Sequence, residues 1–194
     1  MQPATIDERN ITASIEACLK GDTDAFGVIV RAFQQPLHRY GVHFGLRSED
    51  AEDAAVDILI KVFRSLARFD TARGFRPWLF RIAHNHLIEL IRSRSRRRRF
   101  LNETTRCETE RQTSPPPEER FEMHRSARRL QRLLAAVPPK YRDVLVLKYY
   151  HGLSYRDIAA VTGLKENTVA SHLLRAKKRL REEMIKEDAD EMSF

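Results

Sequence analysis

Hydrophobic residues recur along this chain at steps of three and four positions, which is the spacing of one face of an α-helix. One such stripe runs from Phe26 to Tyr40, a second from Ala54 to Leu66 and a third from Leu79 to Ile91. The same spacing resumes beyond residue 121. Nearly every segment follows this pattern rather than the alternation of a β-strand, which predicts an all-α fold.

Polar, proline and glycine residues indicate where these helices begin and end. Asp22 and Thr23 offer caps for the helix that carries the first stripe, and Ser48 offers a cap for the next. Pro77 suits the first position of the third helix, because its fixed φ matches a helical backbone. Pro36 falls inside the first of these helices, where we expect a kink at a cost of about 3 kcal/mol.

A polar segment divides the chain. Residues 100–120 are poor in large apolar side chains and contain the triplet Pro115-Pro116-Pro117, a composition typical of a linker with a stiff extended patch. We therefore predict two small helical domains, over residues 12–99 and 121–185, joined by a flexible linker. Residues 1–11 and the acidic residues 186–194 are expected to be tails, the second of them frayed and solvated.

The second domain has the spacing of a helix-turn-helix. Ser154 and Asp157 are placed as in a capping box, and Gly163 permits the tight turn after the first helix. Val169 and Leu173 anchor a second helix, whose outward face carries short polar residues first and cationic residues later. That order suits base edges followed by phosphates, as in a helix that reads the DNA major groove. The structural alternative is a basic amphipathic helix with a solvated outer face.

The charge of the chain narrows the class of partner. There are 35 Lys and Arg against 27 Asp and Glu, which gives a formal net charge of +8. A positive protein attracts polyanions, so nucleic acid is the first expected partner and an anionic membrane surface the second. Five arginines between residues 94 and 99 repel one another and need solvent or an anion. The sequence has no apolar run near the roughly 20 residues of a spanning helix and no secretory signal, so we expect a cytoplasmic protein without membrane insertion.

Acidic residues gather at the start of the second stripe's helix. Glu49, Asp50, Glu52 and Asp53 complement the positive end of the helix dipole, an effect of about 0.3 to 1 kcal/mol each. Asp57 lies too deep in the helix for that explanation. A role in binding a partner therefore remains open for this helix.

The sequence offers no residue set for catalysis, for a metal or for a cofactor. Cys18 and Cys107 are far apart, and His84 and His86 point in different directions on one helix. We find no glycine-rich phosphate loop, nucleophile elbow or pair of catalytic carboxylates. The expectation is a protein that is not an enzyme and that has neither metal nor cofactor.

Taken in order, these motifs resemble the extracytoplasmic-function (ECF) sigma factors, the specificity subunits of bacterial RNA polymerase. The acidic Asp50-Ala51-Glu52-Asp53, the segment Ala67-Arg68-Phe69-Asp70 and residues 75–85 look like sigma region 2. Residues 133–138, 141–144 and the helix-turn-helix look like region 4. The likeness implies a subunit that binds core RNA polymerase and directs promoter-specific initiation of transcription from −10 and −35 elements.

The resemblance also implies functional residues. A dock on the clamp helices of the polymerase β′ subunit would use Asp50, Glu52, Asp53 and Asp57, although Val56 stands where a polar residue is common. Region 4 would meet the β flap. The −10 element, with one base flipped out of the stack, would be read by Phe69, Asp70, Thr71, Arg73, His84, Asn85, Glu89 and Arg92. The −35 element would be met by Glu166, Asn167, Thr168, Ala170, Ser171, His172, Arg175, Lys178 and Arg179. An anti-sigma factor that masks these surfaces is a further expected partner.

The recognition helix departs from the family pattern. Ala170 and His172 stand where basic residues often flank the serine, so the −35 sequence does not transfer from relatives. Lys165 occupies a position that is often a capping serine. We therefore expect the helix to begin at Asn167 or Thr168.

Two other functions fit part of the pattern. A helix-turn-helix regulator that binds an operator by itself would explain the second domain, since Thr168, Val169 and His172 also resemble response-regulator output domains. It leaves the N-terminal half without a role. A helical adaptor that binds only protein would need neither the arginine run nor the cationic helix. A sigma factor uses both halves.

Overall fold

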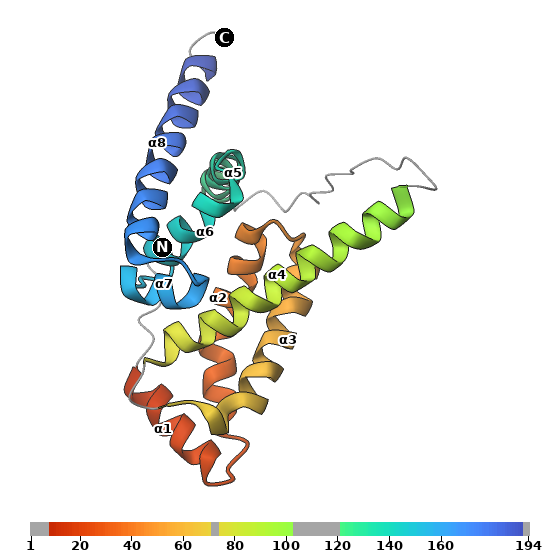
Figure 1. Ribbon diagram of the computed structural model, residues 1–194, viewed down its shortest axis with the longest axis vertical. Helices are drawn as coiled ribbons and strands as arrows, with labels where there is room; N and C mark the ends of the chain where they lie inside the picture. The colour runs from red at the N-terminus through yellow and green to blue at the C-terminus, as the bar shows by residue number, and fades with distance from the viewer. Residues whose placement is uncertain (1–7, 71–73, 103–120, 192–194) are drawn as a thin grey trace.

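The computed structural model describes residues 8–70, 74–102 and 121–191, and all regular structure within them is helical. The helices are α1 (Glu8–Leu19), α2 (Phe26–Phe44), α3 (Ser48–Ser65), the short 3₁₀ turn η1 (Leu66–Arg68), α4 (Phe75–Asn102), α5 (Phe121–Ala136), α6 (Pro139–Tyr149), α7 (Tyr155–Thr162) and α8 (Glu166–Glu191) (Figure 1). The predicted all-α fold is confirmed.

Helices α1 to α4 form the first bundle, with α2 packed along α3 and α3 along α4. The predicted stripes supply its core: Ile29, Phe33, Leu37, Tyr40, Ile58, Val62, Leu79 and Leu87 are buried. Gly41 allows α2 and α3 to approach closely, because a Cβ at this position would lie 3.0 Å from the Cβ of Ala51. Phe63 also belongs to a predicted stripe but remains 41% exposed.

The helix ends match the sequence expectations only in part. The Asp22 carboxylate accepts hydrogen bonds from the backbone N–H groups of Asp24 and Ala25, in the turn before α2. The N-cap of α2 is Ala25, which makes no side-chain capping bond, so the prediction that Asp22 or Thr23 caps this helix was wrong. Pro36 lies inside α2, which is assigned as one helix from Phe26 to Phe44. Ser48 is the first residue of α3 rather than its cap, and its hydroxyl pairs with His38 instead. Pro77 is the third residue of α4, still within the first turn, where its missing N–H costs no helical bond.

Helices α5 to α8 form the second bundle, which contains the predicted helix-turn-helix. Both halves of the capping box are present between Ser154 and Asp157, and Gly163 has the left-handed φ of +73° that its turn requires. The expected start of the second helix was wrong. It begins at Glu166, where the Lys165 carbonyl accepts the first backbone hydrogen bonds.

The described helices reach further towards the two predicted tails than expected. Residues 186–191 belong to α8 rather than to a frayed tail, because Glu187 and Asp188 form ion pairs with Arg129 and Arg132 of α5. At the other end α1 begins at Glu8, and Ile11 is buried, so the core starts before residue 12. The predicted linker begins later than residue 100, since α4 extends to Asn102, and residues 103–120 lie outside the described residues.

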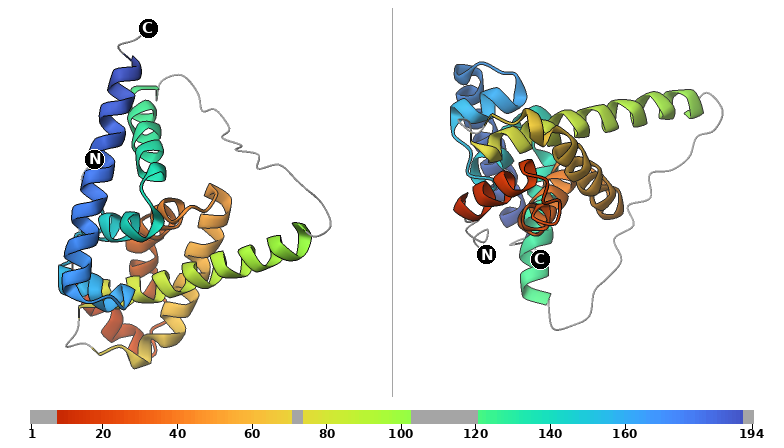
Figure 2. Two further views of the ribbon diagram at one scale, coloured as in Figure 1. Left: turned by 45° about the horizontal axis from the view of Figure 1, so that its top comes forward. Right: turned by 90° about the horizontal axis from the view of Figure 1, so that it is seen from below.

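The two bundles touch. Helix α7 packs on α4 and α6 packs on α2, and one continuous cluster of buried apolar residues spans both bundles. Figures 1 and 2 show α7 beside the start of α4, while the far end of α4 stands clear of the other helices. The contact leaves both Asp53 and Arg175 exposed, so the surfaces expected to bind polymerase and −35 DNA are not buried in it.

Candidate polymerase and nucleic-acid interfaces

The acidic residues of α3 do not all have the same surroundings. Glu52, Asp53 and Asp57 are exposed. Asp50 instead accepts from Arg94 of α4 at 2.7 Å and from Arg47 at 3.0 Å, and its side chain is only 16% exposed. The hydrogen bonds from Arg94 and Arg47 lower the pKa of Asp50 to about 2. Asp50 therefore ties α3 to α4, which makes it a poor contact for a partner.

An exposed apolar stripe lies beside the remaining acids, and sequence reasoning missed it. Val56, Ile60 and Phe63 are 47%, 43% and 41% exposed, at steps of three and four residues. We call Glu52, Asp53, Val56, Asp57, Ile60 and Phe63 the docking face of α3. In the sequence this stripe is visible as a second set of apolar residues at helical spacing, offset from the core positions of the same helix.

The residues expected at the −10 element separate into groups. Phe69 packs against Phe75 and Trp78, with ring centroids 5.4 Å and 5.0 Å apart, so its ring is part of an aromatic cluster. Asp70 is exposed, and Thr71 and Arg73 lie outside the described residues. On α4, Asn85, Glu89 and Arg92 are exposed and share one face at helical spacing.

His84 does not belong to that face. The residue is 6% exposed, and Nδ1 lies 3.2 Å from the Tyr40 hydroxyl and 3.2 Å from Oδ2 of Asp143. Asp143 is on α6, in the second bundle. His84 is therefore covered by the second bundle and cannot meet a base while the two bundles are in contact.

The contact between the bundles has a polar centre. The buried Tyr40 hydroxyl donates to Oδ1 of Asp143 at 2.7 Å, and burial together with the Asp143 charge raises the pKa of Tyr40. On its border Arg142 donates to the His43 carbonyl at 3.3 Å, and Arg39 donates to the Tyr150 hydroxyl. The sequence pattern placed Tyr40 in an apolar stripe and gave no indication that its hydroxyl pairs with Asp143.

His151 fills the apolar part of this contact. It is 1% exposed, and its ring lies 4.1 Å from that of Phe80, 5.4 Å from Tyr40 and 4.9 Å from Tyr150, centroid to centroid. Neither ring nitrogen has a hydrogen-bond partner among the described residues. Burial, with the charges of Arg76 and His43 nearby, lowers the pKa of His151 well below its usual 6.5. We call Tyr40, Phe80, His84, Asp143 and His151 the interbundle contact.

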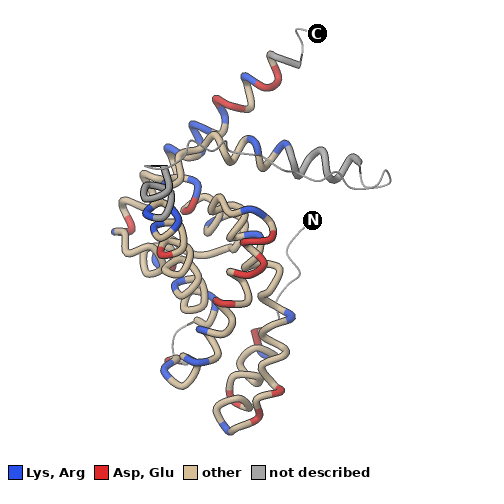
Figure 3. Tube along the Cα trace, turned by 90° about the vertical axis from the view of Figure 1, so that its right-hand side faces the viewer, with Lys and Arg blue, Asp and Glu red and all other residues tan. Residues whose placement is uncertain are grey.

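The residues expected at the −35 element lie along the outer side of α8. Glu166, Asn167, Ala170, Ser171, Arg175, Lys178 and Arg179 are exposed. Thr168 and His172 are half-buried, and the His172 ring meets the edge of Tyr141 at 5.0 Å. In Figure 3 basic positions lie on both α4 and α8, and acidic positions occupy the last described turns of α8. Short polar residues therefore precede cationic ones along the exposed side.

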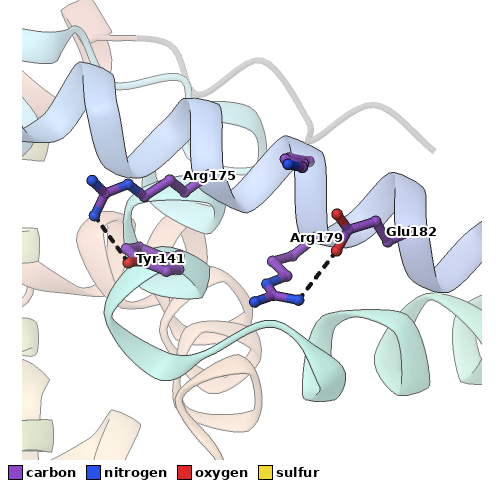
Figure 4. A pocket seen from close by; sticks show the side chains of 5 residues that line it. Tyr141, Arg175, Arg179 and Glu182 are labelled. Carbon is purple, nitrogen blue, oxygen red and sulfur yellow. Dashed lines mark hydrogen bonds and ion pairs between the residues drawn. The ribbon is translucent and has the colours of Figure 1, made fainter.

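A hollow of about 260 Å³ opens between α8 and the start of α6. It is lined by Tyr141, Arg175, Lys178, Arg179 and Glu182. Figure 4 shows Arg175 directed at the Tyr141 hydroxyl, 3.2 Å from Nη1, and Arg179 paired with Glu182 at 3.2 Å. Within the residues the structure describes, no group of His, Cys, Asp and Glu side chains is arranged to hold a metal ion, and no helix there is long and apolar enough to cross a membrane.

Two family models match the two bundles: Sigma-70 region 2 over residues 29–97, and Sigma-70, region 4 over residues 127–180. The ECF RNA polymerase sigma factor SigE of Mycolicibacterium smegmatis is 31% identical over 95% of this chain and 71% of its own length. The chain belongs to the ECF sigma factor family. This sigma factor therefore directs promoter-specific initiation of transcription, and a stand-alone regulator is not favoured.

Other sigma factors are similar as well. SigW of Bacillus subtilis is 28% identical over 91% of this chain and 98% of its own. The solved structure of CnrH in complex with the cytosolic domain of CnrY has a TM-score of 0.65 at 25% identity, covering 95% of this chain and 99% of that one. RpoE of Bartonella quintana, in complex with the anti-sigma factor NepR, has the same TM-score at 22% identity over 81% and 94% of the two chains, which shows a shared fold.

Proposed function

We propose that this sigma factor docks on core RNA polymerase through the docking face of α3, reads the −10 element with α4 and reads the −35 element with α8. Three separate exposed surfaces on the two matched regions support this division. As a subunit of the transcription machinery, the chain would act in the cytoplasm and would carry no catalytic residues of its own.

The docking face suits a partner with an apolar ridge and a basic rim. Burying Ile60 and Phe63 would supply affinity, because apolar surface removed from water contributes about 25 cal/mol per Å². Asp53 and Asp57 at the edge would steer and orient a cationic surface. The clamp helices of β′ are the partner that family membership favours, with the β flap as the partner of the second bundle.

The α4 surface suits DNA whose strands have separated. Asn85 presents an amide that donates and accepts, which fits the hydrogen-bonding edge of a base. Arg92, two turns further along, has the charge to hold the backbone. The −35 surface of α8 combines Asn167 and Ser171 near base edges with Arg175 and Lys178 near phosphates.

The interbundle contact implies a change of shape on binding. His84 reaches DNA only if Asp143 moves away from it, so we infer that the bundles separate when both elements are engaged. Because the two DNA-binding bundles belong to one chain, binding of one bundle raises the effective concentration of the other at the promoter. Because the relative RpoE was solved with an anti-sigma factor, we also propose that an anti-sigma factor binds this chain and masks these surfaces.

Run-off transcription tests the function directly. Purified core polymerase is supplied with this protein and a template library in which the −10 and −35 windows are randomised. We expect transcripts from a defined subset of templates, whose sequences give the two elements. The absence of any protein-dependent, template-selective transcript would end the proposal.

Charge reversal tests the dock. Asp53→Arg should abolish association with core polymerase and leave the circular dichroism spectrum unchanged, because the side chain is exposed. Glu16→Arg is the matched control, since it reverses an exposed acid on α1, away from the docking face. Retained association of the Asp53→Arg protein would place the dock elsewhere.

A further inference from the structure

Tyr141 lies at the start of α6 and packs against the side of α8 that carries the cationic residues. Its hydroxyl accepts a hydrogen bond from Nη1 of Arg175 at 3.2 Å, and the Arg175 guanidinium carbon lies 6.0 Å from the centre of the ring. The Lys140 ammonium lies 5.0 Å from the same ring centre, and the His172 ring meets it edge-on at 5.0 Å. Three neighbours therefore surround the phenol, and Figure 4 shows one of them, Arg175, directed at the hydroxyl.

The partner of Arg175 is neutral, which distinguishes it from its neighbour Arg179. Arg179 pairs with the Glu182 carboxylate at 3.2 Å, so its charge is partly cancelled. A phenol hydroxyl orients Arg175 without cancelling its charge. The hydrogen bond from Arg175 and the nearby Lys140 charge lower the pKa of Tyr141, as expected in a strongly positive environment.

This arrangement matters for binding because a free arginine side chain has many rotamers. Fixing one of them on an anion costs conformational entropy at the moment of binding. A side chain that is already held loses less. Arg175 donates one N–H group to the Tyr141 hydroxyl. The other N–H donors of its guanidinium are available to a ligand in the hollow, beside Lys178.

We propose that Tyr141 is a positioning residue for −35 DNA, which acts by holding Arg175 so that its guanidinium meets one backbone phosphate at the hollow. The inference rests on the proposed function, in which Arg175 lies on the −35 duplex. Tyr141 itself does not contact DNA. It sets the direction of the arginine, and the Lys178 charge beside it adds to the attraction for the phosphate.

A double-mutant cycle tests the proposal in holoenzyme. The probe is the template that wild-type holoenzyme transcribes best from the library randomised at both windows, and its affinity is measured as a function of KCl concentration. Arg175→Ala should weaken binding and reduce the salt slope by about 0.9, the value for one phosphate contact. Tyr141→Phe should weaken binding roughly threefold to tenfold and leave the slope unchanged, because Arg175 keeps its charge but loses its anchor.

The combined variant decides between positioning and direct contact. Tyr141→Phe with Arg175→Ala should bind no more weakly than Arg175→Ala alone, because Tyr141 acts only through Arg175. The positioning role would be wrong if Tyr141→Phe weakened DNA binding as much in the Arg175→Ala protein as in the wild type. It would also be wrong if Tyr141→Phe alone left the affinity unchanged. If Arg175→Ala changes neither affinity nor slope, the −35 assignment of Arg175 fails as well, which is a separate and recognisable result.

Two controls make the cycle specific. Tyr149→Phe removes the hydroxyl of another tyrosine of α6, one that pairs with Lys177 rather than Arg175, and it should leave affinity and slope unchanged. Thermal unfolding followed by circular dichroism should show Tyr141→Phe folded like the wild type, since the ring that packs on His172 is kept.

Discussion

Asp50 and Asp53 are three residues apart on α3 and have different surroundings. Asp50 receives hydrogen bonds from two arginines, whereas Asp53 is exposed. Asp50→Asn should therefore lower the free energy of unfolding by about 1.5 to 3 kcal/mol, the range for hydrogen bonds to charged groups. It should leave the affinity of the folded protein for core polymerase within about twofold of the wild type.

The pH dependence of the same variant gives a second check. Because the pKa of Asp50 is lowered to about 2 in the folded protein, its stabilising effect is present above the ordinary value near 3.8 and is lost as the pH falls from there towards 2. The difference in melting temperature between wild type and Asp50→Asn should shrink over that interval. A difference that stays constant down to pH 2.5 would show that the ion pairs with Arg47 and Arg94 add nothing.

Glu182 sets the charge available at the far side of the hollow. Replacing it by Gln removes the carboxylate that pairs with Arg179 and frees that guanidinium for DNA. Glu182→Gln holoenzyme should bind its template more tightly at low salt, with a salt slope larger by up to about 0.9. Glu183→Gln, which removes a neighbouring carboxylate that pairs with Lys186 instead, is the control.

Helix α3 illustrates how much of an element a sequence predicts. Its core positions followed from their period, because burial requires apolar residues on one face. The second apolar face could not be predicted in this way. The spacing of Val56 and Ile60 does not show whether they form a partner surface or widen the core. The capping box of α7 was predicted correctly because its bonds are local, whereas the bonds of Asp143 and Arg94 to distant helices depend on tertiary packing that spacing does not encode.

The second face of α3 gives a prediction for the whole helix. Ile60→Ser should reduce affinity for core polymerase about tenfold, through loss of buried apolar surface worth roughly 1.5 kcal/mol at the interface. Its melting temperature should stay close to that of the wild type, because Ile60 is already 43% exposed. Ile58→Ser, on the buried face, should instead unfold the first bundle. Pull-down with core polymerase and thermal melts separate the two effects.

At the scale of the whole molecule, protonation opposes the interbundle contact. Burial lowers the pKa of His151 well below 6.5, and burial with the charges of Arg142 and Arg39 lowers that of His43 to about 4. The separated bundles therefore bind more protons than the joined ones as the pH falls below 6.5. The titratable and charged groups around His151 are Tyr40, Tyr150, Arg76 and His43, with the His84–Asp143 pair alongside.

Acidification from pH 7.5 to pH 5 should accordingly shift the free protein towards separated bundles. Energy transfer between dyes on exposed positions of α1 and α8 should fall over this interval, with the helix content unchanged. His151→Phe, which keeps a ring among Phe80, Tyr40 and Tyr150, should stay joined to lower pH. If the energy transfer of His151→Phe falls over the same pH range as that of the wild type, His151 is not the cause of the separation.

The charges of α8 change sign along its length, and this has a consequence for how the protein meets a promoter. Arg175, Lys178 and Arg179 lie around its middle, and Glu187 and Asp188 lie near its end. A DNA duplex attracts the cationic middle of the helix more strongly than its acidic end. The field of the duplex therefore exerts a torque on the approaching molecule, so that the recognition turns arrive first and collisions in the reverse orientation are discouraged before any base is touched.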